Sequence, residues 1–382
     1  MKFELTDDQK AVQEWARNFS ETIVAPVVSK LSDRDKLPMD LLKKLSAEGF
    51  MSLMVPEAQG GAGLDSLSFS LVITELARIC ASTSISVAVT NMIADVLVRE
   101  GQKHHHDKFL SQLLSGESPT ASFCLTENSS GSDASALQMT AKKEGDQYCL
   151  NGEKIYVTNG AFSNFFLIMA RTNTEINGSK GVSAFLVPRA SKGVVIGKEE
   201  DKMGLNASST TRMVFENVLV PESDRLLNEG EGMQVALRAL DGGRISVASQ
   251  ALGVAKRSLE AGIEYAKVRE QFGKTLGEFQ AIQWKIANAS TELSAAELLI
   301  RRAAWLKSQK LPHRLEASMA KLFSTEMAIR LCDEMIQIHG GYGYIKDYPV
   351  EKYYRDVRVT SLYEGTSEIQ RTVIAKNILG GL

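Results

Sequence analysis

The chain is poor in cysteine, and its net charge is close to zero. Among 382 residues there are only four cysteines, and no two of them are spaced as in a C-x-x-C motif. This argues against a disulfide framework and a structural zinc site, and it favours a reducing compartment. With 44 basic and 46 acidic residues the formal net charge is −2, so the charge balance does not indicate nucleic acid or an anionic membrane as a partner.

Long apolar runs and targeting signals are also missing from the sequence. No apolar run reaches the roughly 18 residues that are needed to cross a bilayer. Residues 1–8 are acidic and have no apolar core, which is unlike a secretory or a transit peptide. We therefore expect a cytoplasmic protein. A hydrophobic content of 44% over 382 residues is sufficient for two or three domains around a large core.

Hydrophobic periodicity divides the chain into three parts. Residues 1–120 have apolar stripes at helical spacing, and a capping box at Thr6 and Gln9 begins the first of them. Residues 121–232 have short β-rich runs, with Asn151-Gly152 as a hairpin signal, and predict an antiparallel sandwich or barrel. Residues 233–382 have four long helical segments, as in an antiparallel bundle.

Glycine-rich and histidine-rich stretches do not predict a nucleotide or metal site. Residues 230–232 begin a dinucleotide-like pattern, but its third glycine is missing. The loop at residues 55–63 is not followed by Lys-Ser or Lys-Thr, as a phosphate-binding loop would be. His104, His105 and His106 are consecutive and point in different directions on a helix, so we interpret them as a solvated polar turn. No metal site is predicted.

One glutamate near the C-terminus is placed so that it could point toward a ligand. Glu364 stands between Tyr363 and Gly365, just before a predicted helix with a capping box at Ser367 and Gln370. The glycine would let the backbone approach a ligand closely. Such a carboxylate suits a base, although this stretch alone fits a solvated turn glutamate better.

Four other stretches contain chemistry that a simple connector does not need. Residues 123–133 are rich in hydroxyl and backbone donors for a heterocycle or phosphate, and residues 156–160 place an aromatic and a hydroxyl on one strand face. Residues 269–273 could bind a pyrophosphate through arginine, and residues 337–344 end a helix at glycines. Each also has an ordinary interpretation: a polar connector, barrel core, a charged helix connection or a helix C-cap.

Together these stretches resemble the acyl-CoA dehydrogenase family, in the same order and over essentially the whole chain. The resemblance covers residues 55–64, 124–133, 156–160, 269–273, 337–343 and 363–370. Residues 240–245 and 248–253 are similar to the short-chain, butyryl-CoA-type enzymes. The resemblance implies an α+β fold with an N-terminal α-helical domain (1–120), a middle β-barrel (121–232) and a C-terminal four-helix bundle (233–382).

The resemblance also implies roles for single residues. Glu364 matches the catalytic base that removes the α-proton of an acyl thioester, and Gly243 stands where some relatives carry that base instead. The implied substrate contacts are Ser132, Asp241, Arg244 and Gly365. The implied FAD contacts, several of them across a subunit interface, are Phe123, Cys124, Leu125, Thr126, Ser132, Tyr156, Val157, Thr158, Arg269, Phe272, Gln280, Gln337, Ile338, Gly340, Gly341, Thr366, Ser367 and Glu368.

The implied activity is FAD-dependent α,β-dehydrogenation of a short-chain acyl-CoA to the trans-2-enoyl-CoA. In the family the β-hydrogen leaves as hydride to flavin N5, and an electron-transferring flavoprotein then accepts the electrons. A short branched-chain acyl-CoA dehydrogenase, an oxidase or monooxygenase of the same fold, and a non-catalytic scaffold are the alternatives. A homotetramer is implied, with no nucleic acid and no membrane as partner. Two departures from the family pattern, residues 128–130 and Tyr156 in place of tryptophan, bear on the flavin's potential and shielding.

Overall fold

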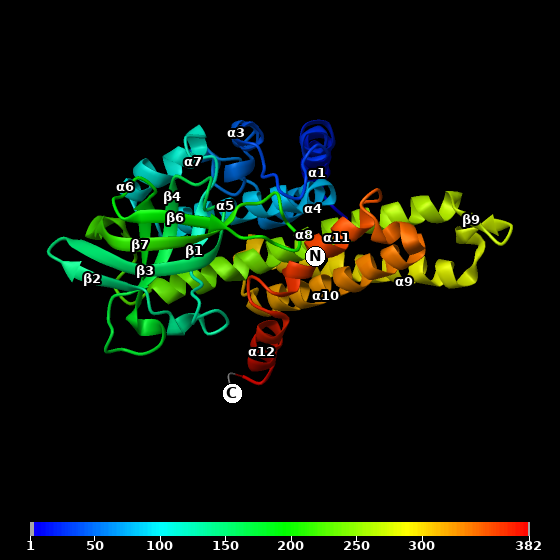
Figure 1. Ribbon diagram of the computed structural model, residues 1–382. Helices are drawn as coiled ribbons and strands as arrows, with labels where there is room; N and C mark the ends of the chain where they lie inside the picture. The colour runs from blue at the N-terminus through cyan, green and yellow to red at the C-terminus, as the bar shows by residue number, and fades with distance from the viewer. Residues whose placement is uncertain (1–3, 381–382) are drawn as a thin grey trace.

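The computed structural model describes residues 4–380, and its first part is helical as predicted (Figure 1). The Thr6–Gln9 capping box is confirmed, with both of its hydrogen bonds present. A π-helical turn, Ser20–Val24, follows the first helix, and a second one, His106–Leu110, precedes the last helix of this part. The helices are α1 (Asp7–Phe19), α2 (Ala25–Val28), α3 (Met39–Ala47), α4 (Ser66–Ile79), α5 (Ala81–Glu100), α6 (Lys103–His105) and α7 (Ser111–Ser115).

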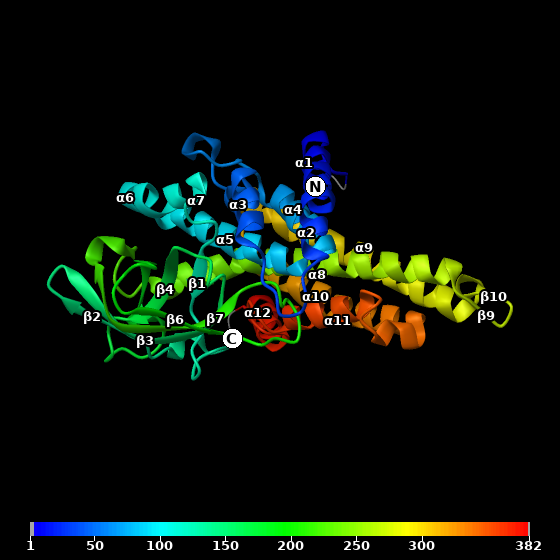
Figure 2. The same ribbon diagram turned by 45° about the horizontal axis from the view of Figure 1, so that its top comes forward.

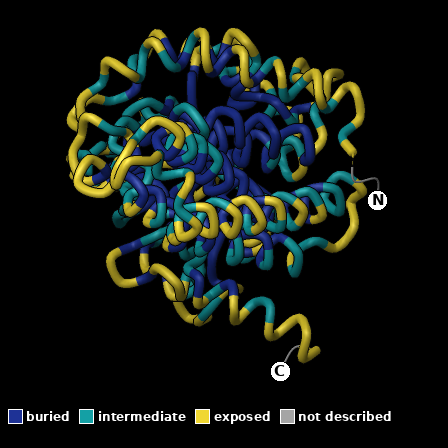
Figure 3. Tube along the Cα trace, turned by 90° about the vertical axis from the view of Figure 1, so that its right-hand side faces the viewer, coloured by how far each residue is buried: buried dark blue, intermediate teal, exposed yellow. Residues whose placement is uncertain are grey.

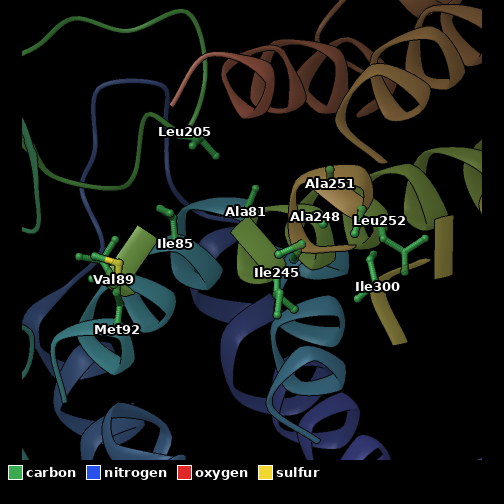
Figure 4. Packing of buried hydrophobic residues seen from close by; sticks show 14 of the residues in the cluster. Ala81, Ile85, Val89, Met92, Leu205, Ile245, Ala248, Ala251, Leu252 and Ile300 are labelled. Carbon is green, nitrogen blue, oxygen red and sulfur yellow. The ribbon is translucent and has the colours of Figure 1, made fainter. Parts of the chain in front are cut away.

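Helix α5 is long and apolar enough to cross a membrane, judged by length and composition alone. The prediction that no stretch passes this test is therefore wrong. However, 89% of its most apolar window is buried inside the fold. It packs along α8 (Gly232–Val268), and Figure 4 shows Ala81 of α5 beside Ile245 and Ala248 of α8. This apolar helix is thus a core helix, shared between the first and the last part of the chain.

The three histidines do not form a solvated turn. They lie in α6 and the π-helical turn that follows it, and His105 is buried. His104 Nε2 is paired with the Ser223 carbonyl oxygen and His106 Nε2 with that of Leu97. Burial lowers the pKa of His105 to about 4. Within residues 4–380 there is no group of three potential metal ligands, here or elsewhere.

The middle part is a β domain, but its sheet is mixed rather than purely antiparallel. Its path runs β6-β7-β3-β2-β4-β5-β8, and β1 pairs with β4 in the parallel sense, as does the end of β2. Its strands are β1 (Ser122–Cys124), β2 (Thr140–Glu144), β3 (Gln147–Thr158), β4 (Phe165–Arg171), β5 (Val182–Pro188), β6 (Val194–Glu199), β7 (Thr210–Pro221) and β8 (Arg225–Leu226). Strand β1, which follows α7, pairs with β4 in the parallel sense. The alternation of side chains in a sequence does not predict whether two strands pair in the parallel or the antiparallel sense.

Asn151-Gly152 does not form the predicted hairpin. The hairpin turn lies earlier in the chain, between β2 and β3, where Glu144 pairs with Gln147. Strand β3 then continues through Asn151 and Gly152. Gly152 has φ +143° and lies at a register shift between β3 and β7. A Cβ added to it would lie 2.8 Å from the Met139 side chain. The dipeptide therefore marks a β-bulge, for which a glycine backbone is equally suited.

The last part contains three long helices and two shorter ones. They are α8, α9 (Gln280–Ser308), α10 (Arg314–His339), α11 (Val350–Arg358) and α12 (Ser367–Ile378), with the small ribbon β9 (Glu270–Gln271) and β10 (Lys274–Thr275) between α8 and α9. The predicted fourth long helix is only the 12-residue α12. In Figure 1 helix α12 projects below the bundle, whereas the β9–β10 ribbon lies at the bundle's right-hand end, which Figure 2 also shows. Most of α12 is exposed, as Figure 3 shows.

Candidate active site

Glu364 lies in a turn between α11 and α12, as predicted, and its backbone is left-handed. Glu364 has φ +54° and Gly365 has φ +88°. A Cβ on Gly365 would lie 2.7 Å from Gln370 Nε2, so a side chain is excluded by both conformation and space. The side-chain amide of Gln370 donates to the carbonyl oxygens of Glu364 (3.2 Å) and Gly365 (2.9 Å). The turn is therefore fixed by the helix that follows it.

The predicted capping box at Ser367 and Gln370 is wrong by one residue. Helix α12 begins after Thr366, whose side-chain oxygen accepts from the Ile369 N–H. Gln370 points its Nε2 at the two carbonyl groups of the turn, and its Oε1 accepts no N-cap amide within residues 4–380. The Ser367 hydroxyl is buried and has no hydrogen-bond partner among the described residues. The sequence pattern thus predicted the start of the helix to within one residue, and the N-cap is Thr366, directly after the two residues with positive φ.

The carboxylate of Glu364 is held against helix α8 at Gly243. A Cβ added at Gly243 would overlap with Glu364 Oε2 and would lie 3.4 Å from Met92 Sδ. Oε2 is shielded from solvent and accepts no hydrogen bond within residues 4–380. Burial raises the pKa of Glu364 to about 7, although the charges of Arg244 and Lys321 oppose this. A carboxylate in this state can take up and release a proton near neutral pH.

A buried arginine, Arg244, and an exposed one, Arg314, share a carboxylate near this site. Arg244 is 4% exposed and donates to Asp241 Oδ1 at 2.6 Å, while its Nε is buried without a partner among the described residues. Arg314 donates to the same Asp241 carboxylate at 3.0 Å. Asp241 and Arg244, both predicted substrate contacts, are thus brought together, one helical turn apart on α8. The unused guanidinium N–H can serve a polar ligand.

Sequence reasoning missed Lys321, which lies under the turn. It is fully buried on α10, and its ammonium group donates to the Gly365 carbonyl oxygen at 2.8 Å. Burial lowers the pKa of Lys321 to about 8, and Glu364 opposes this shift. The available signal was a lysine on a helix face of small residues, with Ala317 four positions before it and Thr325 four after it.

Tyr363 links the turn to two other helices. Its hydroxyl donates to Gln250 Oε1, and Gln250 Nε2 in turn donates to the Ala81 carbonyl oxygen (2.8 Å) and to Ser84 Oγ (3.1 Å). Gln250 is 1% exposed. The turn that carries Glu364 is therefore anchored to α8, α10 and α12, and through Gln250 to α5, by hydrogen bonds as well as by packing.

One group of the predicted FAD contacts comes together on the β domain. The segment at residues 123–126 lies beside β3, where Ile155 N–H donates to the Thr126 carbonyl oxygen at 2.9 Å. Tyr156 is 63% exposed with φ +56°, so it is not barrel core and presents an aromatic face. The side chains of Cys124 and Val157 are buried in the core, so these two residues could meet a ligand only through their backbone. Leu125 is also buried, whereas Phe123, Thr126 and Thr158 are half-buried and Ser132 is exposed.

A second group lies at the far end of the bundle. Arg269, Ile338, Gly340 and Gly341 line a pocket of about 500 Å³. The Arg269 guanidinium lies over the Tyr342 ring, 5.5 Å from its centroid. A Cβ added at Gly340 or Gly341 would meet nothing within 4 Å, so their backbone is open to a ligand. A guanidinium beside glycine backbone that a ligand can approach closely suits a pyrophosphate.

The remaining predicted FAD contacts are more dispersed. Phe272 is 93% exposed on the ribbon loop, and Gln280 and Gln337 are exposed near the same end of the bundle without lining the pocket. Glu368 is exposed on α12, while the Thr366 hydroxyl is used as the helix cap. Helix α8 begins against β5 and ends directly before Arg269. The two groups of predicted FAD contacts therefore lie at opposite ends of the folded molecule (Figure 1). A single chain does not bring them together.

Three family models match the chain in succession. They are the N-terminal domain of acyl-CoA dehydrogenase at residues 6–117, its middle domain at residues 122–218 and its C-terminal domain at residues 230–379. The short-chain specific acyl-CoA dehydrogenase of Clostridium acetobutylicum is 39% identical over 379 residues, which cover 99% of this chain and 100% of that protein.

Solved structures agree with these matches. Butyryl-CoA dehydrogenase from Megasphaera elsdenii superposes with a TM-score of 0.96 at 38% identity, covering 99% of this chain and 100% of the other. A chain in the structure of the electron transferring flavoprotein of Acidaminococcus fermentans superposes with the same score at 39% identity, again covering 99% and 100%.

The raised pKa of Glu364 predicts a pH-dependent gain of stability in Glu364→Gln. The folded state binds the proton more tightly than the unfolded state, so wild-type stability falls as pH rises from about 4.5 to about 7. Glutamine cannot ionise and avoids this loss. We expect the variant to exceed wild type by about 1–3 kcal/mol at pH 8 and by nothing near pH 4.5, measured by urea unfolding. Glu368→Gln, at an exposed site on α12, is the control; an equal gain there would contradict the prediction.

Proposed function

The chain belongs to the acyl-CoA dehydrogenase family, and we propose from this premise that it dehydrogenates a short-chain acyl-CoA to the trans-2-enoyl-CoA. It is an oxidoreductase that uses FAD. The single observation that carries the proposal is the Glu364 carboxylate, which is buried against Gly243 with a pKa of about 7.

The proposed role of Glu364 is that of the base. The α-C–H of a thioester is a weak acid, so its base must be close, poorly solvated and free of competing hydrogen bonds. Glu364 Oε2 meets these conditions, because it is buried and unpaired within residues 4–380. Gly243 cannot act as a base and leaves room for the carboxylate instead. The backbone N–H of Glu364 is the proposed donor to the thioester oxygen, where negative charge develops as the proton leaves.

The two open sites of the chain fit different parts of FAD. Residues 123–126, Ser132 and residues 156–158 would hold the ring, through backbone groups and the exposed Tyr156 face. Arg269 would hold the pyrophosphate through its guanidinium, and the glycines at 340 and 341 leave space for the anion beside the backbone. When bound, FAD supplies the acceptor for the hydride from the β-carbon.

The separation of these two sites supports a shared cofactor. Helix α8 has 37 residues and is therefore about 55 Å long. We infer that the bundle end of a second copy completes the FAD site on the β domain, within the homotetramer implied by the family resemblance.

A short acyl chain is supported by the relatives and by the closed surroundings of Glu364. The relatives from Clostridium acetobutylicum and Megasphaera elsdenii are named for short-chain and butyryl substrates. In this chain Met92 Sδ lies 3.4 Å from the Cβ position built on Gly243, which the Glu364 carboxylate also approaches. A short branched acyl group remains the second candidate substrate. We also propose an electron-transferring flavoprotein as acceptor and a cytoplasmic location.

The central prediction concerns the flavin and its base. Purified protein should be yellow, and butyryl-CoA should bleach it under anaerobic conditions. Glu364→Gln should retain the flavin and lose turnover by at least about 10³-fold, since glutamine cannot take the proton. Stopped-flow absorbance measures the bleaching, and Glu14→Gln, at an exposed site on α1 outside every predicted contact, serves as the control that should still turn over. A protein that cannot bind FAD, or a variant with full activity, would overturn the assignment; peroxide formed in air would indicate the oxidase alternative.

Substrate preference is tested by a panel of acyl-CoAs. We expect kcat/KM to be highest for straight chains of about four carbons and to fall by more than about tenfold for octanoyl-CoA, because extra methylenes need space beside the base, where Met92 already lies. Isobutyryl-CoA and 2-methylbutyryl-CoA represent the branched alternative. A maximum at eight or more carbons would contradict the proposal.

The shared cofactor site predicts the mass of the protein in solution. Light scattering should give four times the chain mass of 41.8 kDa. Arg269→Ala should weaken FAD retention although it lies far from Glu364, and Arg257→Ala, on α8 but outside the pocket, should not. A monomer that holds one FAD would show that each chain suffices alone.

A further inference from the structure

A buried ion pair lies inside the β domain, beside the ring-binding residues. Lys154 on β3 is completely buried, and Glu127, after β1, is 6% exposed. Lys154 Nζ lies 2.7 Å from Glu127 Oε1. Neither residue is used in the proposed chemistry. Two buried charges are costly to desolvate, so their place in the fold calls for a reason.

The pair connects three segments of chain. Lys154 Nζ also donates to the Leu125 carbonyl oxygen at 3.0 Å. The Glu127 carboxylate accepts the backbone N–H groups of Gln138 (2.6 Å) and Met139 (3.0 Å). The loop after β1, the strand β3 and the stretch that leads into β2 are therefore held together at one point by charge-assisted hydrogen bonds.

The contact to Leu125 fixes how the neighbouring peptide faces. Because a peptide unit is planar and trans, the Thr126 N–H points in the opposite direction to the Leu125 carbonyl, away from Lys154. The Thr126 carbonyl oxygen is itself held by the Ile155 N–H at 2.9 Å. Both carbonyl groups thus face β3, and the amide of Thr126 is left to face outward.

The second ring-binding segment begins two residues further along the same strand. Tyr156 has φ +56° and lies where the register between β3 and β7 shifts, between Lys154 and Val157. Lys154 is therefore the last regular residue of β3 before this strained position. The hydrogen bonds of Lys154 therefore fix the position of β3 directly before Tyr156, where the strand loses its regular register with β7.

We propose that Lys154 and Glu127 form a positioning pair for the flavin, which locks the segments at residues 125–126 and 156–158 in one relative orientation and keeps the charge beneath the ring balanced. This inference rests on the proposed function. Apolar residues of the same size would suit folding equally well, but they would not fix the direction of the Leu125 carbonyl.

Three variants test the proposal: Lys154→Met, Glu127→Gln and the double variant. Apoprotein is titrated with FAD by fluorescence, and the reduction potential and visible spectrum of the loaded protein are recorded. We expect each single variant to raise the Kd for FAD about tenfold or more, the scale of a lost charge-assisted hydrogen bond. The potential should fall in Lys154→Met, where a negative charge is left unbalanced, and rise in Glu127→Gln. The double variant should return the potential toward wild type while affinity stays reduced.

Opposite shifts of the potential cannot arise from a general loss of stability. Lys256→Met is the matched control, because it breaks a half-buried pair with Glu297 (2.8 Å) that lies in the bundle; it should change urea unfolding but neither the Kd nor the potential. Unchanged Kd and potential in all three variants, or shifts of one sign, would overturn the proposal. If Lys154→Met does not fold, the isosteric Glu127→Gln and the charge-free double variant decide. Wild-type apoprotein that binds no FAD would instead refute the proposed function.

Discussion

The structure around the site depends on one constraint, which is that a carboxylate must be kept out of water without a permanent partner. Glu364 meets it because Gly243 provides space on α8, and because the backbone of its turn is satisfied by other groups. Lys321 and Gln370 bond to the carbonyl oxygens of the turn and leave the carboxylate itself free. The turn is thus rigid, while its acidic group retains a proton affinity near neutral pH.

The helices around the site hold the residues that surround the Glu364 carboxylate. Helix α8 packs against α4, α5, α9 and α10, and it supplies Gly243, Arg244 and Gln250 from one continuous element. Side chains on a buried helix have few rotamers to choose from, so their mutual positions are set more accurately than loops would allow. Among residues 4–380, the loop residues at this site are those of the turn itself, and they are held by three helices.

The sequence predicted the composition of the site better than its assembly. A Tyr-Glu-Gly turn before a helix, and glycines after another, are local patterns with a physical meaning, and both stand where expected. Lys321 was missed because a lysine on a helix of small and apolar residues does not reveal whether that face is buried. Asn151-Gly152 was misread because a positive φ fits a bulge as well as a hairpin. The parallel pairing of β1 with β4 depends on contacts distant in sequence, which periodicity does not contain.

Glu127 and Glu364 show how environment divides the roles of one residue type. Glu127 accepts hydrogen bonds from Lys154 and from two backbone amides, so its charge is fully compensated and its geometry is fixed. Glu364 has a carboxylate oxygen without any such donor within residues 4–380. A carboxylate surrounded by donors is held in one geometry, whereas one without donors is reactive at some cost in stability. The number of donors around each carboxylate therefore separates the residue that positions the site from the residue that would act as its base.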